Sequence, residues 1–187
     1  MWNITKSISL LYVLYISLSS CNQYIDRVNK TDSPSIKQGY FEFYVDSNVL
    51  VYTPTVGLIT GSKRTNSQWF RIVLPKGIKY YEIQNPRHVS IYYKTDQIIF
   101  LQIDLLEGKS QDTSYQLEKM DAEKFVVDIS TSGNKKYDIS RTKFIKGRSS
   151  YLIRKGVATI LLFNIKPTKF AEFYNSIQTF GFLERGK

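Results

Sequence analysis

The chain has 187 residues, of which 42% are hydrophobic and 14% aromatic, and its formal charge is +10. This is the size of one ordinary domain with a short extension, and the composition is that of a globular protein. The single cysteine excludes a disulfide within the chain. One cysteine and one histidine also cannot supply the several sulfur and nitrogen ligands of a zinc site.

The first 20 residues have the layout of an export signal. Lys6 is their only charge, and an apolar run at 8–16 follows it. That run is shorter than the roughly 20 residues needed to cross a bilayer, and two small residues, Ser19 and Ser20, end the segment. An uncleaved membrane anchor and an ordinary signal peptide cut near Ser20 are two alternatives.

The cysteine favours a third interpretation. Leu18-Ser19-Ser20-Cys21 resembles the lipobox of bacterial lipoproteins. The resemblance implies a diacylglycerol on Cys21, cleavage between Ser20 and Cys21, and a further acyl chain, such as palmitate, on the new amino group. It places the protein in the bacterial cell envelope with its domain outside the cytoplasm, and Asn22 favours the outer membrane over the inner. Lipidation also explains an unpaired thiol in an exported protein.

The charge of the exported part favours anionic surroundings. Because Lys6 is removed with the signal, 25 basic residues face 16 acidic ones, which leaves a formal charge of +9. Lipid headgroups and acidic polysaccharides suit such a charge, and nucleic acid is not expected outside the cytoplasm. The expected partners are therefore the membrane, through the lipid on Cys21, and an envelope protein or an anionic glycan. The alternative is that the charge serves solubility alone.

The chain divides into three parts. Residues 1–20 form the signal, and the polar, aperiodic residues 21–37 predict a flexible tether. Residues 38–187 predict a single globular domain. Its β-branched and aromatic runs predict strands at 40–45, 49–52, 56–60, 69–74, 78–83, 88–93, 97–103, 125–129, 143–145, 150–154 and 157–165. Turn clusters predict hairpins at 40–52, 88–103 and 150–165, with loops at 61–66 and 84–87 and a weak helical turn or two at 115–124.

One helix is clearly predicted near the C-terminus. Pro167 suits a helix start, and an apolar stripe recurs at helical spacing through Phe170, Phe173, Tyr174 and Ile177. A last short strand is expected at 180–183. Antiparallel strands covered by a C-terminal helix predict a two-layer α+β domain. This ending, an aromatic strand, a proline-started helix and a short phenylalanine-containing strand, is similar in style to the PsbP-like family, which implies binding or assembly work more than catalysis.

Motifs for catalysis are weak. His88, at the start of a predicted strand, has no oriented triad around it in the sequence, and residues 57–63 lack the spacing of a phosphate-binding loop. No metal site and no cofactor are expected. Paired carboxylates could hydrolyse glycosidic bonds, and Glu42, Glu82 and Asp104 are the candidates. This gives the alternative function, an envelope enzyme acting on glycans.

Tyrosine pairs indicate a candidate binding surface. Neighbours in a strand point to opposite faces, so each pair should direct one ring inward and one outward. The candidate surface patch consists of Tyr80, Tyr81, Tyr92, Tyr93, Arg87 and Lys94. Packing of these rings across strands is the competing interpretation. The sequence thus predicts a membrane-anchored lipoprotein with a non-enzymatic binding or assembly domain. A passive subunit of a larger complex, which would carry a flat apolar patch, is a further alternative.

Overall fold

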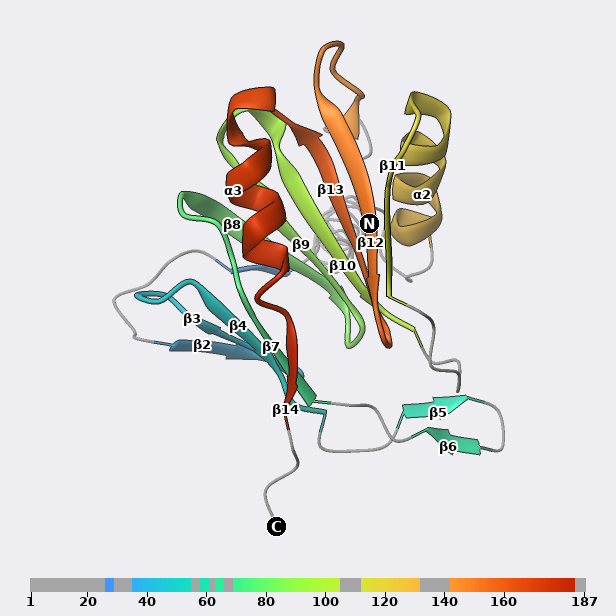
Figure 1. Ribbon diagram of the computed structural model, residues 1–187. Helices are drawn as coiled ribbons and strands as arrows, with labels where there is room; N and C mark the ends of the chain where they lie inside the picture. The colour runs from blue at the N-terminus through green and yellow to red at the C-terminus, as the bar shows by residue number, and fades with distance from the viewer. Residues whose placement is uncertain are drawn as a thin grey trace, which may run out of the picture.

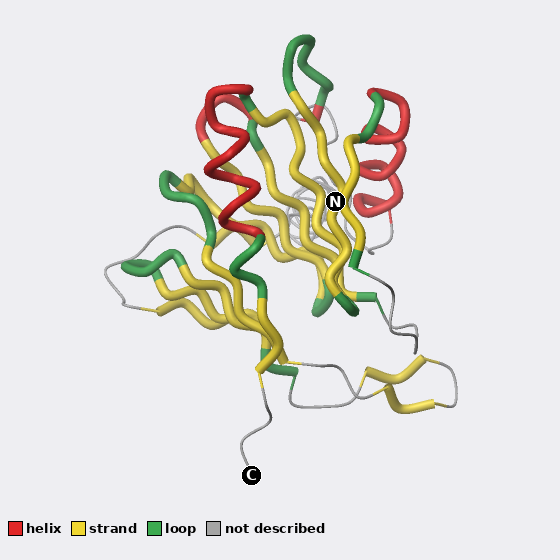
Figure 2. The backbone as a smooth tube through the Cα atoms, viewed as in Figure 1, coloured by secondary structure: helices red, strands yellow, loops and turns green. Residues whose placement is uncertain are grey.

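A computed structural model describes residues 26–28, 35–54, 58–60, 63–65, 69–104, 112–131 and 142–183. These residues form a mixed α+β domain that is mostly sheet, with two antiparallel sheets stacked on each other (Figure 1). Strands make up most of the described backbone (Figure 2). The predicted class, α+β with antiparallel pairing, is confirmed.

The larger sheet has seven strands in the described part of the chain. Their order is β1 (Asp26–Val28), β8 (Ile78–Asn85), β9 (His88–Tyr93), β10 (Ile98–Ile103), β13 (Ala158–Ile165), β12 (Ser149–Lys155) and β11 (Thr113–Gln116). A 3-10 turn, η2 (Lys94–Asp96), joins β9 to β10. The hairpins predicted at 88–103 and 150–165 are confirmed by the β9–β10 and β12–β13 pairings.

The smaller sheet has five described strands. Their order is β14 (Gly181–Leu183), β7 (Trp69–Val73), β4 (Val49–Tyr52), β3 (Phe41–Tyr44) and β2 (Ser35–Gln38). The hairpin predicted at 40–52 and the short strand near the C-terminus are confirmed. A separate hairpin pairs β5 (Leu58–Thr60) with β6 (Lys63–Thr65), so a strand replaces part of the loop expected at 61–66.

Two strands fall within the segment predicted to be a flexible tether. Strand β1 pairs with β8 at one edge of the larger sheet, and β2 pairs with β3 at one edge of the smaller sheet. The backbone groups of 26–28 and 35–38 are therefore used in sheet hydrogen bonds. Only residues 22–25 lie between the predicted lipidation site, Cys21, and the first of these strands.

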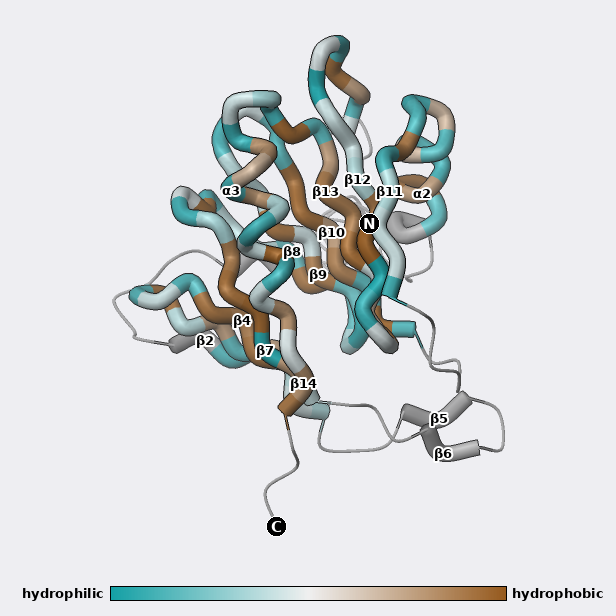
Figure 3. The backbone as a smooth tube through the Cα atoms, viewed as in Figure 1, coloured by the Kyte–Doolittle hydropathy of each residue, from teal (hydrophilic) through white to brown (hydrophobic). Residues whose placement is uncertain are grey.

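The main core lies between the two sheets. On β10, Ile99, Leu101 and Ile103 point into it, and Ile98 and Phe100 point to the opposite face, because side chains alternate along a strand. A ring contact between Tyr81 of β8 and Phe43 of β3, with centroids 3.8 Å apart, links the sheets directly. The central strands of the two sheets are accordingly the most hydrophobic part of the described chain (Figure 3).

The predicted C-terminal helix is present as α3 (Pro167–Ile177), with proline in its first turn. Phe173 and Ile177 are buried in the main core, and the Phe173 ring contacts that of Tyr93 at 4.7 Å. The chain then crosses to the smaller sheet, where the Val73 amide donates to Thr179 Oγ1 at 2.8 Å and Ser176 Oγ donates to the Val73 carbonyl. Helix α3 and its C-terminal turn thus join the two sheets.

Helix α2 (Lys119–Thr131) is the largest departure from the sequence prediction. Residues 125–129 predicted a strand because β-branched and aromatic residues dominate them. In the structure they continue a helix whose Ala122 and Val126, four residues apart, are buried against the second face of the larger sheet, while Val127 is 40% exposed. The strand prediction is wrong here because packing against the sheet outweighs local propensity. With α2 on this face, the domain has three layers where two were expected (Figure 1).

Residues 143–145 were predicted to form a strand, but they are not in a strand. The side chain of Asn164 bonds to their backbone instead. Asn164, fully buried in β13, accepts from the Ile145 amide at 2.9 Å and donates to the Lys143 carbonyl at 2.8 Å. Its φ of +56° is in the left-handed region, which asparagine adopts more readily than most residues. The Ile145 amide and the Lys143 carbonyl are therefore bonded to a side chain, and the Ile145 carbonyl accepts from the Arg148 amide at 3.2 Å.

Candidate functional site

All four tyrosines of the predicted patch are buried. Tyr81 and Tyr93 lie in the main core, whereas Tyr80 and Tyr92 stack at 4.5 Å on the opposite face, in the cluster that α2 covers. The exposed fractions are 9%, 1%, 5% and 5% for Tyr80, Tyr81, Tyr92 and Tyr93. The alternation between faces is as expected, but both faces are covered at these positions, so the rings do not form an exposed platform.

The two cations of the predicted patch do not meet. Arg87 lies in the turn that precedes β9, and Lys94 lies in the turn that follows it, so the length of the strand separates them. A six-residue strand spans about 20 Å. Arg87 is half-buried and Lys94 is exposed. The structure therefore does not bring the six residues of the patch together.

The buried tyrosines behave as core residues. Burial raises the pKa of Tyr81 to about 12 and raises the pKa of Tyr93 well above its ordinary value. The Tyr93 and Tyr52 hydroxyls have no hydrogen-bond partner among the described residues. These rings stay neutral at physiological pH and fill the space between the sheets.

His88 is held in its neutral form at the β8–β9 turn. Asn85 Oδ1 accepts from the Arg87 amide at 2.8 Å, which turns the Asn85 amide nitrogen toward His88 Nδ1 at 3.0 Å. His88 Nδ1 is therefore the acceptor. Burial, and then the positive charge of Arg87, lower the pKa of His88 to about 4. The prediction of a strand-end histidine is correct, but the side chain is only 3% exposed and is not at the surface.

Asp104 lies near His88 in a polar row at the same end of the larger sheet. His88 is opposite Gln102, and Gln102 is opposite Thr159. The Asp104 carboxylate accepts from Gln102 Nε2 at 3.2 Å and from Thr159 Oγ1 at 2.7 Å. Both carboxylate oxygens thus have a partner, and the row ties β10 to β13.

The three candidate carboxylates lie apart. Glu82 is opposite Ser90, and Ser90 is opposite Phe100, so Asp104 lies two strands away from Glu82 and four residues further along. With strands about 4.8 Å apart and about 3.3 Å per residue, their Cα atoms are roughly 16 Å apart. The carboxyl pairs of glycosidases are about 5 to 9.5 Å apart. Glu42 belongs to the smaller sheet, so these three residues do not form such a pair.

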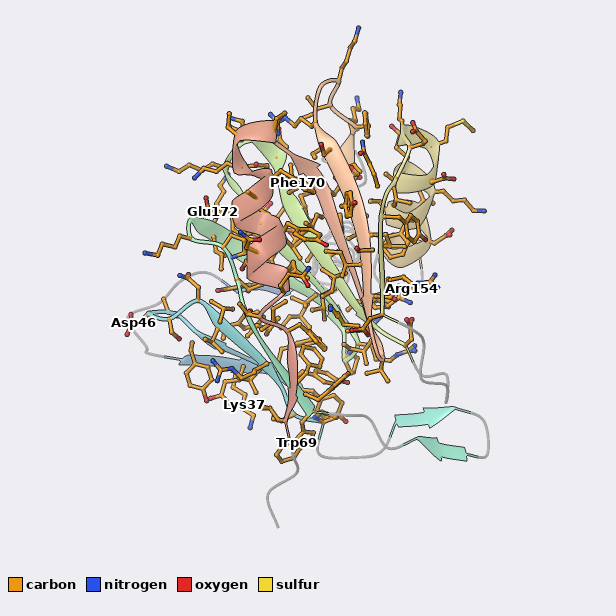
Figure 4. All side chains as sticks on the ribbon, in the orientation of Figure 1. Lys37, Asp46, Trp69, Arg154, Phe170 and Glu172 are labelled. Atoms are coloured by element: carbon orange, nitrogen blue, oxygen red, sulfur yellow. The ribbon has the colours of Figure 1, made fainter. Side chains whose placement is uncertain are left out.

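The outer side of the smaller sheet forms a different candidate site. Within the described residues, no helix or strand covers this side (Figure 1). Its register aligns Lys37, Glu42, Val51 and Arg71 in one row across four strands. We call this side the open face, and it consists of Lys37, Glu42, Tyr44, Val49, Val51, Trp69, Arg71, Val73 and Leu183. Figure 4 shows Lys37 and Trp69 on the side of the smaller sheet that is turned away from the larger one.

The open face combines aromatic, aliphatic and basic groups. Lys37 and Arg71 are exposed, Tyr44 is 38% exposed, and Trp69 is half-buried with its Nε1 donating to the Pro54 carbonyl at 3.3 Å. Desolvation, the Glu42 charge and a hydrogen bond to Glu42 raise the pKa of Tyr44. Glu42 is the only carboxylate of this face, and its effect on the pKa of Tyr44 places the two side chains close together.

The open face was not predicted from the sequence, although a signal for it exists. Buried and less buried residues alternate along β3, β4 and β7, so each of these strands has one outward-facing set. The sequence does not say that these three strands are neighbours. That pairing brings Trp69, Arg71 and Tyr44 to one surface.

The remaining predictions concern the anchor residues, metal ligands and membrane-spanning helices. Ser20 and Cys21, the predicted cleavage and lipidation sites, lie outside the described residues. In the described ranges, no three His, Cys, Asp or Glu side chains gather as metal ligands would. The helices described are too short or too polar to span a membrane. Comparison of the chain with protein-family models, curated proteins and solved structures finds no match.

Proposed function

We propose that this protein is a lipoprotein of the bacterial cell envelope, anchored through lipid on Cys21, whose α+β domain is a non-enzymatic binding module. The anchor rests on Leu18-Ser19-Ser20-Cys21 at the end of a short apolar run. Two or more acyl chains at one residue suffice for durable attachment, because each buried methylene contributes about 0.8 kcal/mol.

The open face is the observation that supports a binding role. A five-stranded sheet with one side packed on a core, and the other side not covered by any described helix or strand, presents aromatic and basic side chains on one surface. An uncovered sheet face suits association with another surface more than enclosure of a small substrate, which takes a concave pocket. The polar residues most suited to chemistry, His88 and Asp104, are engaged in hydrogen bonds that connect neighbouring strands and turns.

The anchor is tested by lipid labelling of the full chain. Wild-type protein and the Cys21→Ser variant are expressed with a radioactive or clickable palmitate precursor, and envelope fractions are compared. We expect label and membrane association in the wild type and neither in the variant. A Gln23→Ser variant, changed two positions beyond the modified residue and outside the lipobox, would serve as the control. Wild-type protein that takes no label would refute the anchor.

The membrane that holds the protein is tested separately. Asn22 follows the predicted lipidated residue, and the lipoprotein resemblance implies transfer to the outer membrane for this residue. Density-gradient separation of the two membranes should find the wild type in the outer membrane and Asn22→Asp in the inner one. The same location for both proteins would contradict the assignment, while the lipid label would still decide the anchor.

A further inference from the structure

We infer that the open face docks on anionic lipid, so that the domain lies against the membrane that holds its anchor. This inference rests on the proposed lipidation of Cys21 and names the partner of the binding module. It uses three arguments: the chemistry of the face, the small number of residues between Cys21 and strand β1, and the charge of the exported chain.

The chemistry of the open face suits a membrane–water boundary. Trp69 and Tyr44 are amphipathic rings of the kind that concentrates at membrane interfaces. The face also carries three half-buried valines and Leu183, and two exposed cations, Lys37 and Arg71. Apolar groups that enter the headgroup layer, beside cations that meet phosphates, are what binds a surface element to anionic lipid.

The chain between anchor and domain is short enough for this docking. Strand β1 begins at Asp26, five residues after Cys21, and five residues span at most about 17 Å. Stacked sheets lie about 10 Å apart. Strand β8, the neighbour of β1, lies over β3, as the Tyr81–Phe43 contact shows. A chain of this length exceeds the spacing between the two sheets, which allows the anchor to lie at the level of the smaller sheet.

Charge favours an anionic lipid over a neutral one. The exported chain has a formal charge of +9, and the open face itself carries two exposed cations, Lys37 and Arg71, against one carboxylate, Glu42. Each basic residue at an anionic membrane favours association roughly fivefold. Reversing both Lys37 and Arg71 should lower the ratio of docked to undocked protein by roughly 25-fold or more.

The test uses tryptophan fluorescence of the lipidated protein. The chain has two tryptophans, Trp2 in the signal and Trp69 on the open face, so the mature protein retains only Trp69. The protein is reconstituted in vesicles of phosphatidylcholine alone, or of phosphatidylcholine with phosphatidylglycerol, in which part of the lipid carries brominated acyl chains. We expect bromolipid to quench Trp69 in the vesicles that contain phosphatidylglycerol, and high salt to reverse the quenching.

Two charge-reversal variants complete the experiment. Lys37→Glu with Arg71→Glu should remove the quenching while the anchor keeps the protein on the vesicles. Lys119→Glu with Lys124→Glu makes the same change of charge at two exposed positions of α2 and should leave the quenching unchanged. Circular dichroism and thermal melting would verify that both variants fold.

Each outcome decides the inference. If Trp69 stays unquenched in both kinds of vesicle, the docking on anionic lipid is overturned. This holds even if the open face then binds an added anionic glycan or envelope protein. Equal effects of the two charge reversals also overturn it, since net charge would then act without the open face. A protein that carries no lipid label refutes the proposed anchor instead, whereas a labelled protein with unquenched Trp69 refutes only the docking.

Discussion

Lowering the pH should destabilise the domain through His88. The side chain is 3% exposed, and its Nδ1 faces the amide nitrogen of Asn85 at 3.0 Å. A proton on Nδ1 would set two donors against each other. Rotating the Asn85 amide would not relieve this without cost, because Asn85 Oδ1 accepts from the Arg87 amide. Burial and the nearby Arg87 charge act in the same direction, against the charged imidazole.

The size and sign of the effect follow from the two pKa values of His88. The pKa is about 4 in the folded protein, compared with 6.5 for an ordinary histidine. Because the folded-state pKa is the lower one, the unfolded chain takes up the proton first. The contribution of His88 to stability is complete above pH 6.5 and is lost as the pH falls toward 4. From these two pKa values, linkage between protonation and folding lowers the free energy of unfolding by about 2 kcal/mol between pH 7.5 and pH 5, and by about 3 kcal/mol by pH 4.

Urea unfolding at pH 7.5 and pH 5 measures this loss. Between the two pH values, the free energy of unfolding should fall by about 2 kcal/mol more in the wild type than in His88→Gln. The variant retains every other titrating group, so the difference isolates His88. His88 is the only histidine in the chain, so its ring protons give an unambiguous NMR titration even where the variant folds poorly. A titration midpoint near 6.5, or equal losses in the two proteins, would refute the argument.

Two further predictions concern backbone positions with positive φ, and urea unfolding tests both. Gly156→Ala should cost about 1 to 3 kcal/mol, because φ is +53° and a Cβ would lie 2.4 Å from Cζ of Phe182. Gly39→Ala, at φ +60° with no atom within 4 Å, isolates the backbone cost, and an equal loss there would rule out the clash with Phe182. Asn164→Ala should cost about 1 to 3 kcal/mol, since the partly buried Ile145 amide and Lys143 carbonyl lose their partner. Asn48→Ala, at φ +52°, is its control, and similar losses at the two positions would contradict the role assigned to the Asn164 side chain.

The candidate site was only partly accessible from the sequence. Alternation correctly sends Tyr80 and Tyr81 to opposite faces, but it cannot show that α2 covers one face while α3 and the smaller sheet cover the other. The predicted exposed patch fails for that reason. Conversely, Trp69 and Arg71 belong to the open face because β7 pairs with β4, some 20 residues earlier in the chain.

Elements with a clear local sequence pattern were predicted correctly, and the element without one was not. The hairpin at 88–103 was recognisable because its strands are strongly apolar and a short polar turn joins them. Helix α3 was recognisable from a proline start and a regular apolar stripe. Helix α2 was missed because Phe125, Val126 and Val127 favour a strand when taken alone, and only burial of Ala122 and Val126 against the larger sheet stabilises them in a helix.

The sequence by itself determined the predicted anchor at Cys21, the antiparallel hairpins and the helix that begins at Pro167, since each depends on neighbours within a few residues. Only the tertiary structure decided that the tyrosine pairs are buried, that 119–131 is helical and that no described helix or strand covers the open face. The physical reason is that periodicity specifies which side chains share a face of a strand. Whether that face is buried depends on segments distant in the chain that pack against it.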